Sequence, residues 1–157
     1  MECDRDDSAI ELRRFVREIN QLEGEDSCQI IQDIEPLFDV VRRRFPPYLG
    51  GIDWRRATLL ESSGPSPDET HFRFLRRIIG HWTALRSLAS IRATDRVFLL
   101  SDDYFDAALA CVAGAVPRVL EGWLRFPHAI MITNPDREFC LHISFSRSAY
   151  LGRAGQR

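Results

Sequence analysis

The stretch AIMITNPDREFCLHISF, residues 129–145, decides the fold, because two apolar runs flank a group of turn-forming residues. Residues 134–137 (NPDR) have the sequence of a type I turn with proline at its second position. From 139 to 145, apolar residues alternate with others, which indicates a strand with one buried face. We predict a hairpin in which Thr133 pairs with Glu138. The residues expected on its buried face are Ile130, Ile132, Phe139, Leu141, Ile143 and Phe145.

Residues 67–89 form the strongest predicted helix of the chain. Pro67-Asp68-Glu69 is typical of a helix start, and the apolar residues that follow recur at helical spacing. The expected core-facing stripe consists of Phe72, Leu75, Ile78, Ile79, Trp82, Leu85 and Ala89. This length and amphipathicity predict one long central helix packed on the sheet.

Between this helix and the hairpin, residues 96–100 (RVFLL) predict a buried strand. Ser101 then reads as the N-cap of a helix whose apolar side carries Phe105, Leu109 and Val112. A shorter helical piece follows at 119–124. A helical crossover after Leu100 is long enough to make part of the sheet parallel.

The N-terminal part is predicted to be helical over 8–45. A first helix is expected from the capping residue Ser8 to Gly24, and a second from 26 to 44 with a kink or a restart at Pro36. Residues 45–51 (FPPYLGG) must be irregular, and 57–61 are compatible with a short strand.

These elements predict an α+β fold, with N-terminal helices and one long central helix on a small, mainly antiparallel sheet that ends in a β-hairpin. The chain has 157 residues, which suits a single domain over 1–152 followed by an exposed tail at 153–157. No run approaches the roughly 20 apolar residues of a membrane span. We therefore expect a cytoplasmic protein that does not associate with membranes.

The composition narrows the possible chemistry. All 21 basic residues are arginine, and the absence of lysine excludes Schiff-base chemistry and a phosphate-binding P-loop. Three of the four cysteines, Cys28, Cys111 and Cys140, lie in apolar runs and are expected to be buried thiols. No spacing of cysteine or histidine predicts a metal site, and no motif predicts a cofactor.

Three carboxylates, Asp102, Asp103 and Asp106, follow the strand predicted at 96–100. Acidic residues in a first helical turn stabilise the helix by about 0.3–1 kcal/mol each, which is one interpretation. Contact with a basic protein partner is a second, and binding of Mg²⁺ is a third. Since no further acidic motif accompanies these carboxylates, we predict no metal.

A small hydrolase that uses Asp102 or Asp103 with a histidine such as His142 is an alternative, which requires these groups to converge in a pocket. His142 and Cys140 are two residues apart on the predicted strand, about 6.5–7 Å, which is too far for a direct hydrogen bond. A packed histidine is therefore expected.

Arginines suggest a further alternative, in which Arg42, Arg43, Arg44, Arg55 and Arg56 bind nucleic acid with an affinity that falls steeply with salt. The triplet at 42–44 also complements the carbonyl end of the predicted helix. Because the formal net charge is −2, we do not expect nucleic acid as the partner.

Residues 53–152 resemble small bacterial immunity or antitoxin-type proteins. The resemblance is carried by Trp54, the helix to Trp82, the run VFLLSDDYF at 97–105 and the hairpin that ends at Phe145. It implies a non-enzymatic interaction protein that blocks a protein partner, such as a cognate toxin, by surface complementarity. The expected partner-binding residues are Asp102, Asp103, Tyr104 and Asp106, with Tyr48 and Trp54 as exposed aromatic residues.

Overall fold

The computed structural model describes residues 2–49, 51–101, 107–125 and 129–155. Its helices are α1 (Glu2–Glu23), α2 (Glu35–Arg44), α3 (His71–Leu88) and α4 (Val116–Trp123), with a 3-10 turn, η1 (Ala113–Ala115), before α4. Its strands are β1 (Cys28–Ile31), β2 (Pro47–Tyr48), β3 (Gly51–Ile52), β4 (Ala57–Ser63), β5 (Arg96–Ser101), β6 (Ala107–Val112), β7 (Ile130–Thr133), β8 (Phe139–Ile143) and β9 (Ala149–Ala154). No helix in the described part of the chain is long and apolar enough to cross a membrane.

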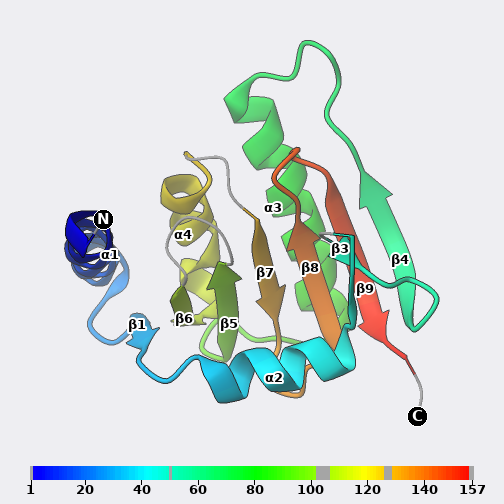
Figure 1. Ribbon diagram of the computed structural model, residues 1–157. Helices are drawn as coiled ribbons and strands as arrows, with labels where there is room; N and C mark the ends of the chain where they lie inside the picture. The colour runs from blue at the N-terminus through cyan, green and yellow to red at the C-terminus, as the bar shows by residue number, and fades with distance from the viewer. Residues whose placement is uncertain (1, 50, 102–106, 126–128, 156–157) are drawn as a thin grey trace.

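Seven strands form one sheet in the order β1-β6-β5-β7-β8-β9-β4, and every neighbouring pair is antiparallel (Figure 1). The strands β2 and β3 form a separate small hairpin. The predicted α+β class is therefore confirmed, and the strands expected at 57–61 and 96–100 correspond to β4 and β5. The sheet is larger than expected, and no described pair is parallel.

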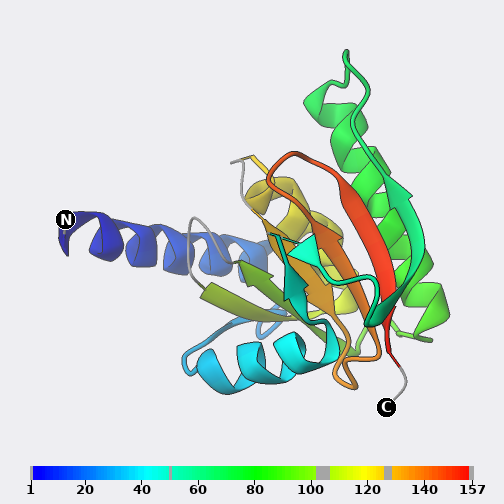
Figure 2. The ribbon, with the colours of Figure 1, turned by 45° about the vertical axis from the view of Figure 1, so that its right-hand side comes forward.

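Helices cover both faces of the sheet (Figures 1 and 2). One face packs against α3 and α4, with α1 at the edge beside β1. The opposite face packs against α2 and the β2–β3 hairpin. Alternate residues of the central strands thus enter two different cores, which explains why these strands are apolar on both sides.

The helix α1 joins the larger of these cores through Leu12, Val16 and Ile19. Phe15 lies against Trp123 of α4, with the ring centroids 6.5 Å apart. A side-chain carbon at Gly122 would overlap the Phe15 ring, so glycine permits this close approach. The helix begins before the capping residue predicted at Ser8 and ends at Glu23, and Gly24 follows it with a φ of +109°.

The helix predicted from 26 to 44 is only half correct. Its first part is the edge strand β1, and α2 begins at Glu35 with Pro36 in its first turn, where a missing N–H costs nothing. Asn20 explains the strand, because its side chain donates to the Cys28 carbonyl (3.0 Å) and accepts from the Cys28 N–H (2.9 Å). These two bonds satisfy the backbone N–H and carbonyl of Cys28 on the side of β1 that faces away from β6.

The helix predicted after Ser101 is wrong, since residues 107–112 form β6 between β1 and β5. The segment AALACV is a short apolar run, whose pattern alone does not separate a buried helix from a buried strand. Pairing on both sides supplies hydrogen bonds that decide for the strand. No helix therefore runs on to Val112, and the carboxylates at 102, 103 and 106 themselves lie outside the described residues.

The C-terminal hairpin forms, with a register two residues away from the predicted one. Thr133 pairs with Cys140, not with Glu138. The cause is Asn134, whose Oδ1 accepts from the N–H groups of Glu138 (3.0 Å) and Phe139 (3.2 Å) and so widens the loop. A shift of two residues keeps each side chain on its face, and the predicted core side of the strands is correct for Ile130 to Ile143. Phe145, however, lies beyond β8 and is 63% exposed.

The burial pattern of α3 differs from the prediction at its N-terminal end. Thr70 caps the helix by accepting from the Arg73 N–H (3.2 Å), so the helix starts after Glu69. The buried residues are Phe74, Ile78, His81, Trp82 and Leu85, whereas Phe72 is 67% exposed. The predicted tail also starts too early, because Arg153 and Ala154 continue β9.

The cysteines expected in apolar surroundings are buried. Cys28 and Cys111 are directly opposite each other on β1 and β6, with their sulfurs 3.0 Å apart. The contact with Cys28 and burial both raise the pKa of the Cys111 thiol. Burial likewise raises the pKa of Cys140, which lies on the other face of the sheet. All three therefore serve as small apolar side chains.

Candidate functional site

The predicted acidic site falls on the connection between β5 and β6. Asp102, Asp103, Tyr104 and Asp106 lie outside the described residues. The flanking residues Ser101 and Ala107 are Cα partners in the antiparallel register of the two strands. The site residues thus belong to the link between two paired strands, and their role in partner binding stays a prediction.

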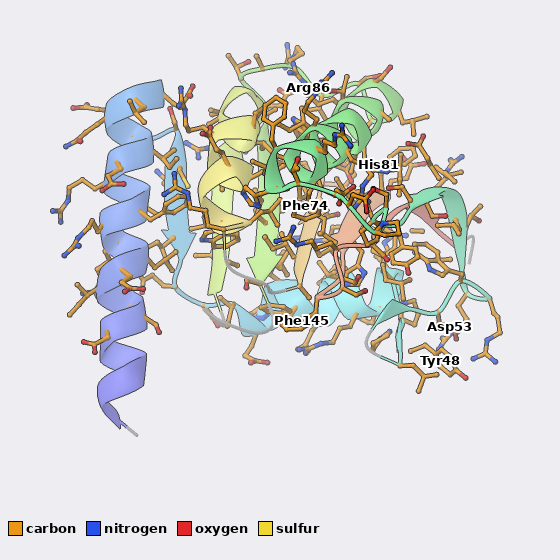
Figure 3. All side chains as sticks on the ribbon, turned by 90° about the horizontal axis from the view of Figure 1, so that it is seen from above. Tyr48, Asp53, Phe74, His81, Arg86 and Phe145 are labelled. Carbon is orange, nitrogen blue, oxygen red and sulfur yellow. The ribbon has the colours of Figure 1, made fainter. Side chains whose placement is uncertain are left out.

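The two predicted aromatic residues have different surroundings. Tyr48, on the β2–β3 hairpin, is 51% exposed, and the Arg55 guanidinium lies 4.8 Å from its ring centroid (Figure 3). Trp54 is half-buried, with its ring 6.1 Å from that of Tyr150. A side-chain carbon at Gly152 would overlap the Trp54 ring. The expected exposure is therefore observed for Tyr48, whereas Trp54 packs against β9.

The turn after this hairpin is organised by Asp53. Its Oδ1 accepts from the backbone N–H of Arg55 (3.1 Å), and its two carboxylate oxygens bind the Arg55 guanidinium (2.9 and 3.2 Å). Hydrogen bonds from Arg55 hold the pKa of Asp53 below its ordinary value. The Asp53 carbonyl also accepts from the N–H groups of Arg56 and Ala57. One carboxylate thus fixes both the turn and the guanidinium that covers Tyr48.

Four arginines meet at a cavity beside this turn. Arg43 and Arg44 come from the last turn of α2, and Arg55 and Arg56 from the turn before β4. The cavity has a volume of about 660 Å³. The sequence analysis considered these arginines together with Arg42 as an alternative site for nucleic acid. The structure brings all of them except Arg42 to one cavity.

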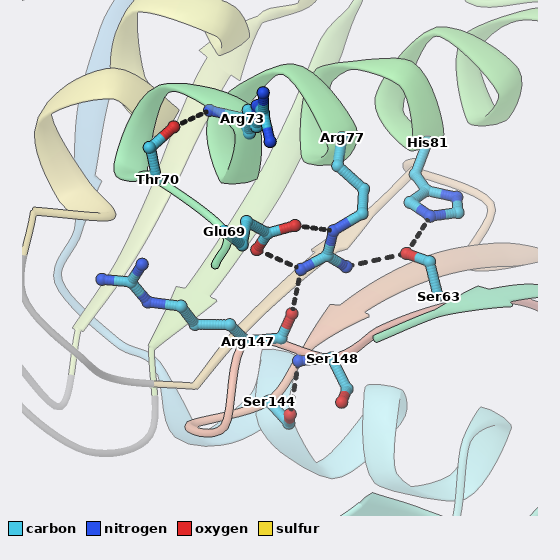
Figure 4. A network of polar contacts seen from close by, with 9 residues as sticks. All are labelled: Ser63, Glu69, Thr70, Arg73, Arg77, His81, Ser144, Arg147 and Ser148. Carbon is cyan, nitrogen blue, oxygen red and sulfur yellow. Dashed lines mark hydrogen bonds and ion pairs between the residues drawn. The ribbon is translucent and has the colours of Figure 1, made fainter. Parts of the chain in front are cut away.

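A second polar cluster joins β4, α3 and the loop after β8, and it was missed from the sequence (Figure 4). Arg77 binds Glu69 through two bonds (2.8 and 2.9 Å) and donates to the carbonyl of Arg147 (2.6 Å) and to Ser63 Oγ (2.8 Å). Ser63 Oγ also lies 2.7 Å from His81 Nε2. The alternation that places Glu61 and Ser63 on one face of β4 is the only sequence signal for this cluster.

The contact between Ser63 and His81 has the distance of a nucleophile and its base. A Glu61 oxygen lies 2.6 Å from His81 Nδ1, but out of line for a hydrogen bond. Ser63 Oγ already accepts from Arg77, and Arg77 is in turn bound by Glu69. Because Arg77 joins Ser63 of β4, Glu69 before α3 and the Arg147 carbonyl after β8, the cluster is best explained as a clamp between three segments.

The structure adds no support for the hydrolase that the sequence left as an alternative. His142 is buried on β8 and its ring lies 6.1 Å from that of Tyr150, so it is a packed histidine as expected. Its proposed partners Asp102 and Asp103 lie outside the described residues. Within the described ranges, no three histidine, cysteine or acidic side chains gather in a way that could hold a metal ion.

Comparison with known proteins adds no assignment. No family model matches the chain, and no curated protein matches it either.

Proposed function

We propose that this chain is a non-enzymatic, cytoplasmic interaction protein of the bacterial immunity or antitoxin kind, which blocks a protein partner by covering part of its surface. The observation that carries the proposal is the β2–β3 hairpin, in which Tyr48 and Leu49 are exposed to solvent. The ion pair between Asp53 and Arg55 holds the turn that follows this hairpin.

The exposed hairpin has the composition of an interface anchor. Leu49 is 89% exposed with a φ of +48°, so a leucine occupies a strained position where it contributes nothing to the core. Tyr48 is stacked under Arg55, and tyrosine and arginine are the residue types that dominate binding energy in interfaces. Because Asp53 and Arg55 already hold the hairpin, little conformational entropy is lost on binding.

The acidic segment is proposed as a second contact. Asp102, Asp103 and Asp106 place three carboxylates within a short link, with Tyr104 among them. Such a segment suits a basic partner, for example a nuclease-like toxin, since complementary charges accelerate association and reject other partners.

The test uses the product of the neighbouring gene as the candidate partner. Expressed alone it should be toxic, and coexpression with this chain should restore growth and give a complex measurable by calorimetry. The proposal is wrong if the neighbour is harmless and forms no complex.

Two variants locate the contact once a complex exists. Tyr48→Ala with Leu49→Ala should weaken binding at least tenfold, whereas Leu22→Ala, at an exposed leucine of α1, should not. Asp102→Asn with Asp103→Asn should weaken binding at least tenfold at low salt, while the circular dichroism spectrum stays native. Unchanged affinity in one of the double variants would remove that segment from the interface.

A further inference from the structure

The cavity with four arginines is built by the chain and is not a chance meeting of flexible side chains. The N–H of Asp53 donates to the carbonyl of Pro46 (2.7 Å), which ties the turn before β4 to the end of α2. The same residue caps the turn that carries Arg55 and Arg56. Gly155, the residue after β9, closes the wall, and a side-chain carbon there would overlap the Arg56 carbonyl.

The positive charge of this cavity is only partly neutralised within the described residues. Asp53 forms an ion pair with Arg55, and the Asp39 carboxylate is 3.7 Å from Arg42, outside the cavity. Arg43 donates to the Asp39 carbonyl, but neither it nor Arg44 nor Arg56 has an ion pair with a carboxylate of the described chain. Stabilisation of the α2 carbonyl end explains cations at 43 and 44, but not those at 55 and 56.

The charge of the whole chain limits the kind of anion. With a formal net charge of −2, the protein does not attract an extended polyanion from a distance. At about 0.1 M salt the screening length is about 10 Å, so attraction is confined to groups that enter the cavity. Guanidinium groups bind phosphate oxygens through two parallel hydrogen bonds, and several arginines together match a multiply charged phosphate better than a single carboxylate.

We infer that the cavity between Arg43, Arg44, Arg55 and Arg56 binds a small phosphorylated molecule through its phosphate groups. The volume of about 660 Å³ accommodates a compact ligand. Thr58, exposed on the cavity wall, adds a hydroxyl donor. This binding needs neither the hairpin tip nor the acidic segment of the proposed protein interface, although Arg55 lines the cavity and also lies against Tyr48.

The test is calorimetric titration of the full chain with inorganic pyrophosphate and with ADP. Both should bind saturably with a stoichiometry of one. Arg44→Gln with Arg56→Gln should weaken both at least tenfold, and the corresponding lysine pair should weaken them less, since lysine keeps the charge but loses the paired donors. The matched control is Arg13→Gln with Arg14→Gln, which removes two exposed charges from α1 and should change the affinity less than twofold.

Three results would overturn the inference. The first is that neither probe binds. The second is that the control pair weakens binding as much as the cavity pair, which would mean that the probes respond to the overall charge of the protein and not to the cavity. The third is that a single-stranded oligonucleotide of twelve nucleotides binds more tightly than ADP, with a steep salt dependence. The last result would assign the arginines to a nucleic-acid surface. Urea denaturation of each variant verifies that a lost signal does not reflect unfolding.

Discussion

Two groups of arginines, around Arg77 and around Arg44 and Arg56, illustrate how one residue type serves two purposes. The Arg77 side chain is 16% exposed and its guanidinium is bound by a carboxylate, a carbonyl and a hydroxyl of its own chain. Arg44 and Arg56 line an open cavity and have no ion pair with a described carboxylate. The first group holds the fold together, and the second is available to a ligand.

The difference arises from desolvation. A guanidinium taken out of water must have all its donors satisfied, and the chain supplies Glu69, Arg147 and Ser63 for Arg77 (Figure 4). A guanidinium that stays hydrated at the surface does not need partners from its own chain, so the fold does not require an arginine at that position. Substitutions should therefore cost much stability in the first group and little in the second.

The largest expected effect is that of Arg77→Met. Removing the guanidinium leaves Glu69, whose side chain is 8% exposed, without its counterion, and should lower the free energy of unfolding by about 3 kcal/mol. For a domain of this size that is a fall in Tm of about 6–12 °C. Urea denaturation followed by circular dichroism measures the change. The control Arg73→Met, at an exposed position on the same helix, should stay within about 0.5 kcal/mol, and a loss below 1 kcal/mol for Arg77→Met would contradict the clamp.

Acid should weaken the same clamp, with a smaller effect. Hydrogen bonds from Arg77 hold the pKa of Glu69 below its ordinary value of 4.5. Because the pKa is lower in the folded state, the stabilisation is complete above about pH 4.5 and is lost as the pH falls through the folded pKa. Urea midpoints between about pH 6 and 3 should therefore fall less steeply in Glu69→Gln than in the unmodified protein. Some slope should remain, since the pKa values of Asp53 and Asp95 are also lowered by arginines. Equal slopes would show that Glu69 is not the group responsible.

The cavity arginines should have the smallest effect on stability. Arg44→Gln with Arg56→Gln removes two like charges that share a cavity, and should change the free energy of unfolding by at most about 0.5 kcal/mol. Thermal denaturation at low salt is the measurement. A loss above 1.5 kcal/mol would mean that these side chains serve the fold, as Arg77 does.

The elements predicted correctly are those whose local pattern has one interpretation. The run at 96–100 and the helical spacing from Ile78 to Leu85 led directly to β5 and α3. The faces of the hairpin strands were also predictable, because alternation survives a register error of two residues. The arginines of the cavity were grouped from the sequence as one alternative site, but the cavity itself and the exclusion of Arg42 from it were not predictable.

The amino-acid sequence by itself determined the fold class, the buried sides of β7 and β8 and the all-arginine character of the surface cations. Only the tertiary structure decided that 28–31 and 107–112 are strands, because short apolar runs take the conformation in which their neighbours satisfy their hydrogen bonds. The same holds for the two arginine groups. Whether a guanidinium is a structural clamp or a free donor depends on which carboxylates and carbonyls the fold brings to it, and these come from segments far apart in the chain.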